Sequence, residues 1–204
     1  MAITNGYCTL DDAKRVMGIE DADDNYRIEA LITAVSRLID RHTRRRFWTT
    51  AVDEIRYYTP MSYASVLTDD IISIASIATD PDGSGSFATA WASTDYQLSP
   101  YNASADGVPY TEIQIKRSGA QTFPCIERSV KVTGKFGVVS TSPWQEIVRE
   151  ACLLQTHKWF KRKDSPFGVA GSSEMGQLTM LKSKLDPDVE LALAPPIRRL
   201  NNNG

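Results

Sequence analysis

The chain has 204 residues, of which 42% are hydrophobic and 24% charged, the balance of an ordinary globular protein. Its 23 Lys and Arg against 25 Asp and Glu give a net charge of -2 at pH 7. This excludes a globally basic nucleic-acid coat, although local basic patches remain possible. The absence of an apolar run of about 18 residues and of a signal-peptide pattern predicts a soluble protein made in the cytosol.

The first part of the chain is predicted to be helical. Thr9 can cap a short helix that runs to Met17 and ends at Gly18. The acidic residues 20–24 can cap a second helix, over about residues 24–43. Its apolar side chains recur at spacings of three and four, which is typical of an amphipathic helix: Ile28, Leu31, Ile32, Val35, Leu38 and Ile39.

From Phe47 onward the pattern changes to short segments rich in aromatic and β-branched residues, with turns between them. Residues 80–85 predict a hairpin turn, and residues 102–109 predict a loop. The sequence therefore predicts a small antiparallel sheet or sandwich. Its expected strands lie within residues 47–52, 55–59, 71–77, 88–98, 112–116 and 129–133.

Helix is predicted again after Ser142, a good N-cap, and Pro143, which fits the first helical position. This helix is expected to run to about Lys163. Glycines in residues 167–177 predict a mobile loop, and Asp186 starts a short last helix through Leu193.

The helices at both ends of the chain each have one apolar face, and neither end can bury its own. We therefore expect an α+β fold that is mainly helical. Its helical domain comprises residues 1–46 and 140–194, residues 47–139 form an inserted small antiparallel β domain, and residues 195–204 form a flexible C-terminal tail.

Motifs that carry enzyme chemistry are not found. Residues 129–136 fail the phosphate-loop pattern, because Ser129 replaces the first glycine and Phe136 the Ser or Thr. Residues 80–85 resemble the start of a calcium loop, but Trp91 stands where a bidentate Glu belongs. No nucleophile elbow occurs. The sequence thus predicts no catalytic residues, no metal and no cofactor, and an enzyme is the least favoured class.

Two basic clusters end the two long predicted helices. One interpretation is that these cations only stabilise the helices, because the helix dipole favours positive charge at a helix C-terminus. The other is a positive surface for an acidic partner or a DNA backbone. The candidate partner-binding residues are Arg44, Arg45 and Arg46 in the first cluster, Lys158, Lys161, Arg162 and Lys163 in the second, and Ile197, Arg198, Arg199 and Leu200 in the tail.

Several segments, taken in order, resemble the head–tail connector (adaptor) proteins of tailed bacteriophages and prophages, in a long form with an inserted β region. They are TLDDAK at 9–14, IDRHTRRRF at 39–47, VKVTGKFG at 130–137, EACLLQ at 150–155, FKRKDSPFG at 160–168 and LDPDV at 185–189. The β insertion matches through TDYQL at 94–98 and YNA at 101–103.

The resemblance implies a virion structural protein of the particle neck, synthesised in the bacterial host cytoplasm, with no enzymatic activity, cofactor or membrane association. It implies a homo-oligomeric ring that binds the portal protein on one side and a stopper or tail-completion protein on the other. Viral DNA would pass through the lumen during genome ejection. Residues 185–204 are predicted to engage the portal, and the basic clusters to meet protein acids rather than DNA.

The alternative from another functional class is a DNA-binding regulator of the helix-turn-helix type, with the arginines as phosphate contacts. No short helix pair with an exposed polar recognition helix is evident in the sequence, and the inserted strands would need another purpose.

Overall fold

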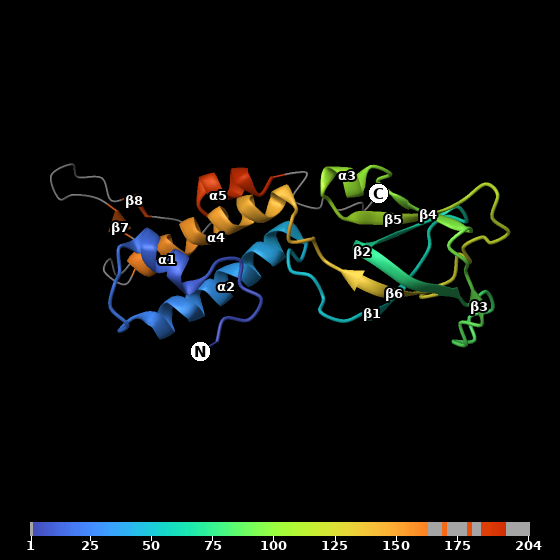
Figure 1. Ribbon diagram of the computed structural model, residues 1–204, viewed down its shortest axis with the longest axis horizontal. Helices are drawn as coiled ribbons and strands as arrows, with labels where there is room; N and C mark the ends of the chain where they lie inside the picture. The colour runs from blue at the N-terminus through green and yellow to red at the C-terminus, as the bar shows by residue number, and fades with distance from the viewer. Residues whose placement is uncertain (1, 163–168, 171–178, 181–184, 195–204) are drawn as a thin grey trace. The chain divides into compact units, whose positions relative to one another are not determined.

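A computed structural model describes residues 2–162, 169–170, 179–180 and 185–194. The chain divides into two compact units, which we call the helical unit (Met1–Arg44 with Trp144–Gly204) and the β unit (Arg45–Pro143). Helices and an antiparallel sheet are both present, so the predicted α+β class is confirmed (Figure 1). The domain organisation expected from the sequence, a helical domain over 1–46 and 140–194, an inserted β domain over 47–139 and a tail over 195–204, stays a prediction.

The first two helices of the helical unit follow the sequence prediction closely. Helix α1 (Leu10–Met17) begins with a capping box, in which the Thr9 hydroxyl accepts the N–H of Asp12 and the Asp12 carboxylate accepts the N–H of Thr9. It ends at Gly18, which has a left-handed conformation. Helix α2 (Asn25–Thr43) starts one residue later than predicted, and its N-cap residue makes no side-chain capping hydrogen bond.

Helix α4 (Pro143–Lys161) packs antiparallel to α2 (Figure 1). The guanidinium of Arg27, near the start of α2, lies 5.5 Å from the ring centroid of Phe160, near the end of α4. Further along, the Ser36 hydroxyl is 3.6 Å from the Cys152 sulfur. The apolar residues buried between and around these helices include Ile28, Ile32, Val35, Ile39, Val148, Ala151 and Leu153.

Two shorter segments cover the α2–α4 pair. The N-terminal segment is held by the N–H of Tyr7, which donates to Ser36, and by Cys8, whose sulfur is 3.4 Å from that of Cys152 without a disulfide. Helix α5 (Pro187–Ala192) is capped by Asp186, as predicted, and the Asp186 N–H donates to the buried Gln155 amide oxygen. Both chain ends are thereby tied to the same central helix.

Residues 169–170, within the loop expected over 167–177, form a short strand that the sequence does not predict. Strand β7 (Val169–Ala170) pairs antiparallel with β8 (Thr179–Met180). The other residues of that loop, and the predicted tail 195–204, lie outside the described residues.

The β unit holds one antiparallel sheet with the order β1-β6-β2-β5-β4, and β3 pairs with β2. The long strand β2 pairs with β5 through its first half and with β6 through its second half, with register shifts in both ladders. The strands are β1 (Glu54–Tyr58), β2 (Ser65–Thr79), β3 (Thr89–Ala90), β4 (Tyr96–Ser99), β5 (Tyr110–Ile115) and β6 (Val130–Phe136).

Three predictions for this region are wrong. Residues 47–52 form no strand. Thr50 meets the end of β6 through one backbone hydrogen bond, from its N–H to the Phe136 carbonyl, and its hydroxyl rather than a carbonyl accepts the N–H of Phe136, so no ladder extends from this contact. The single strand expected over 88–98 is two strands, because Asp95 closes a turn by accepting the N–H of Ala92. The loop expected over 102–109 contains a short helix, α3 (Ala103–Asp106).

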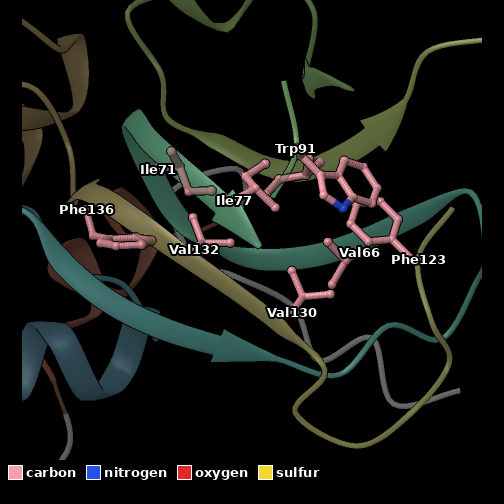
Figure 2. Close-up of a cluster of buried hydrophobic side chains, with 9 residues drawn as sticks. Val66, Ile71, Ile77, Trp91, Phe123, Val130, Val132 and Phe136 are labelled. Carbon is pink, nitrogen blue, oxygen red and sulfur yellow. The ribbon is translucent and has the colours of Figure 1, made fainter. Parts of the chain in front are cut away.

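The core of the β unit lies on one face of the curved sheet, as Figure 2 shows. Trp91 stacks on Phe123 with ring centroids 4.5 Å apart, and the indole N–H donates to the Thr79 hydroxyl. The residue that broke the calcium-loop pattern is therefore part of the core. The predicted turn at 80–85 is confirmed: the buried Asp80 carboxylate accepts the N–H groups of Ser84 and Gly85.

None of the helices in the described part of the chain is long and apolar enough to span a bilayer.

The Asp12 carboxylate links α1 to α4, because it accepts a hydrogen bond from the Arg149 guanidinium at 2.9 Å. This bond, with that of Thr9, lowers the pKa of Asp12 to about 2. The contribution to stability is complete above pH 4 and is lost as the pH falls towards 2.

We therefore expect Asp12→Asn to lower the free energy of unfolding at pH 7 by about 1 kcal/mol or less, since the pair is partly exposed. The difference from the wild type should shrink between pH 4 and pH 2, measured by urea unfolding at each pH. A difference that is constant over this pH range would contradict the role of the Asp12–Arg149 pair in lowering the pKa of Asp12.

Candidate interaction surfaces

Within the described ranges, no group of three or more His, Cys, Asp or Glu side chains is placed to hold a metal ion. The buried polar side chains of the β unit hold the fold together, as Asp80 does for its turn. The sequence-based candidates are the two basic clusters, and the structure adds a group of aromatic and basic side chains on the β unit.

The first basic cluster divides into three different environments. Arg44 is exposed and ends α2 in a left-handed conformation, its N–H donating to the Asp40 carbonyl. Arg46 is exposed, with its guanidinium 5.5 Å from the ring centroid of Trp48. Both are available to a partner.

Arg45 is different, because its side chain is only 9% exposed. Its guanidinium forms an ion pair with the Asp70 carboxylate, which is 5% exposed, and the Asp70 carbonyl accepts the N–H of Gly137. A charge neutralised inside the β unit cannot serve as a surface cation, so we leave Arg45 out of the partner-binding proposal.

The second cluster is also partly used within the chain. Lys158 forms a 3.0 Å ion pair with Asp186, the N-cap of α5, and this hydrogen bond lowers the pKa of the Asp186 carboxyl. Lys161 is exposed at the end of α4, and Arg162 is half-buried. Lys163, Ile197, Arg198, Arg199 and Leu200 lie outside the described residues.

The structure does not bring the two clusters together within the helical unit. Arg44 follows the C-terminal end of α2, whereas Lys161 ends α4, and the two helices run antiparallel. The two cations therefore lie at opposite ends of the helix pair. Their role in binding a partner stays a prediction.

A third surface feature was not predicted from the sequence. Tyr57 is 44% exposed, and its ring centroid is 5.3 Å from that of Phe87. The Arg128 guanidinium lies 5.5 Å from the Tyr57 ring, and the Lys131 ammonium 5.3 Å from the Phe87 ring. With the exposed Ile55 from the same strand face, these residues form what we call the Tyr57 patch.

Two of the patch residues have an uncommon backbone. Phe87 has a φ of 46° and Arg128 a φ of 54°, both in the left-handed region that bulky side chains seldom occupy. The Arg128 N–H donates to the Thr59 hydroxyl at 2.9 Å, which fixes that conformation. Strained residues often gather at functional sites, so this patch is a candidate interaction surface.

The alternation along β1 misleads a sequence-based assignment of this face. Arg56 points to the core side, where its guanidinium lies 4.0 Å from the ring centroid of the buried Phe136 and pairs with Glu54 and Asp69. Tyr57, opposite Lys131 in the ladder, therefore points outward. A pattern of polar-out and apolar-in residues would place them the other way.

Comparison with known proteins gives a fold relationship. No family model matches the chain, and no curated protein does. A solved structure described as the neck of an empty GTA (gene transfer agent) particle, computed with C6 symmetry, contains a similar chain with a TM-score of 0.52. The identity is 10%, and the match covers 94% of this chain and 92% of that one. At this identity the likeness shows a shared fold.

Arg45 and Arg46 provide a matched pair for testing the division of the first cluster. We expect Arg45→Met to lower the free energy of unfolding by about 3–5 kcal/mol, because it leaves the buried Asp70 carboxylate without its ion-pair partner. Arg46→Met removes an exposed cation–π contact and should cost about 1 kcal/mol or less. Urea unfolding measures the free energy of unfolding of both variants. Equal losses would contradict the assignment of Arg45 to a buried ion pair and of Arg46 to the surface.

Proposed function

We propose that this chain is a structural component of the neck of a phage or phage-like particle, a head–tail connector whose copies form a ring beneath the portal. The observation that carries the proposal is the fold shared with a chain from a particle neck across more than nine-tenths of both chains. The resemblance of the helix ends and of β6 to connector proteins points to the same role independently.

A ring requires a specific kind of contact between its copies. Copies related by cyclic symmetry meet through two different faces, which must be complementary to each other. The helical unit and the β unit supply chemically different surfaces for this purpose. The helical unit exposes carboxylates in the turn before α2, and the β unit exposes the Tyr57 patch.

A non-enzymatic role fits the way in which buried polar groups are used. The Arg45–Asp70 pair is neutralised inside the β unit, and Gln155 accepts the N–H of Asp186 at the start of α5. These groups are engaged in holding secondary structure together. Such a protein acts through the surfaces that it presents to its neighbours.

The C-terminal tail is the proposed portal-binding segment. Val189 and Leu193 are fully buried, and the Lys158–Asp186 pair fixes the start of α5 on α4. Residues 195–204 therefore follow an anchored helix and include apolar and basic side chains at 197–200. The net charge of -2 suits a ring through which DNA moves without being held by phosphate contacts.

Deletion of residues 195–204 tests the portal contact. We expect the variant to bind purified portal protein at least about tenfold more weakly than the full chain, because the apolar and basic anchors are removed. Circular dichroism checks that the helices of the variant stay folded, since α5 ends at Ala192, before the deletion. Substituting Arg198 and Arg199 alone by Ala separates the charged from the apolar contribution. Unchanged affinity of the deletion variant would reject the proposed contact.

An electrophoretic shift with duplex DNA separates this function from a DNA-binding regulator. The connector between α1 and α2, residues 18–24, is longer than the three- or four-residue turn of a helix-turn-helix. We therefore expect no tight duplex binding by the purified chain. A tight shift that is lost on neutralising Arg44 and Arg46 would favour the regulator instead.

A further inference from the structure

The Tyr57 patch and the acidic turn before α2 are complementary in charge and lie on different units of the chain. We propose that the Tyr57 patch of one copy binds the acidic turn, residues 20–24, of the neighbouring copy. This inference rests on the ring proposed above and specifies one of its inter-subunit contacts.

The cations of the Tyr57 patch are available for an anionic partner. Among the described residues, neither Arg128 nor Lys131 forms an ion pair with a carboxylate, and both lie over aromatic rings instead. Cations held against aromatic rings can still attract an anion, because the rings contribute no opposing full charge. Exposed Tyr57 and Ile55 add area that an interface would bury.

The surroundings of the patch favour a protein over a nucleic acid. The exposed carboxylates of Glu127 and Asp82 belong to the two loops that border it, and a Cβ at Gly83 would contact Ile126 at 3.6 Å. A duplex backbone is an extended row of charges that would have to pass these acidic groups, whereas a turn of a few residues can contact the two cations alone. A compact patch of Tyr, Phe and Arg is instead typical of the centre of a protein interface.

The acidic turn has the matching properties. Glu20, Asp21 and Asp23 are exposed, and in the described part of the chain none of their carboxylates pairs with a cation. Lys14 donates to the backbone carbonyls of Glu20 and Asp21, and the Asp21 carboxylate accepts the N–H of Asp23, so these contacts hold the turn while its side chains stay exposed. Tyr26, in the first turn of α2, is 67% exposed beside them.

The two surfaces also satisfy the symmetry of a ring. The patch belongs to the β unit and the acidic turn to the helical unit, so one copy can offer its patch to one neighbour and its turn to the other. Contacts of this heterologous kind can close by rotation into a ring.

A charge-swap cycle tests the contact. Self-association of the full chain is measured by sedimentation equilibrium up to the solubility limit, for the wild type, Arg128→Glu, Asp23→Lys and the double variant. We expect each single reversal to weaken self-association by at least about tenfold, and the double variant to recover most of that loss. Lys131→Glu, on a regular strand, serves as a second single reversal that does not disturb a left-handed residue.

Arg117→Glu is the matched control, because Arg117 is an exposed arginine in the turn after β5 and outside the patch. It should leave self-association within about twofold of the wild type. Self-association that persists unchanged in Arg128→Glu and Lys131→Glu would overturn the contact while leaving the ring intact.

Two other outcomes also decide the question. A wild type that remains monomeric at every concentration would contradict the proposed ring, and this contact with it. Duplex DNA binding that the patch reversals abolish would identify the patch as a nucleic-acid surface and overturn its assignment to a second copy.

Discussion

The packing of α2 against α4 holds the helical unit together. Each helix has a buried face that its own end of the chain cannot cover, and the two faces come from residues about a hundred positions apart. Closing so long a loop costs little more entropy than closing a shorter one. Because the helices are antiparallel, the chain leaves α2 and re-enters α4 at the same end of the pair, and the intervening residues can form a unit with its own core.

Local signals made the helices predictable, and tertiary contacts made parts of the sheet unpredictable. The Thr9 cap and the spacing of apolar residues in α2 act over a few residues, so the sequence shows them directly. Thr50, by contrast, replaces a ladder carbonyl with its hydroxyl, and the Arg56 side chain lies over Phe136. Both depend on residues that are distant in sequence. The same holds for Arg45, because its ion-pair partner Asp70 is 25 residues away in the sequence.

The candidate surfaces were also predictable only where their residues are close together in the sequence. The basic clusters were visible because their residues are consecutive, yet the structure uses Arg45 and Lys158 in ion pairs within the chain. The Tyr57 patch was not visible, because Tyr57, Phe87, Arg128 and Lys131 come from separate segments that the sheet brings together. Its cations lie over aromatic rings and, in the described part of the chain, form no ion pair with a carboxylate; with the exposed Tyr57 ring, they make it the better candidate for an interface. Under the proposed function, such surfaces would meet copies of the chain and neighbouring particle components.

The most direct test of this account is a cryo-electron microscopy reconstruction of the neck of particles purified from the host that encodes the chain. We expect a closed ring of this chain between the portal and the tail, with the helical and β units recognisable in the density. Complete, tailed particles in which the chain is absent from the neck would contradict it.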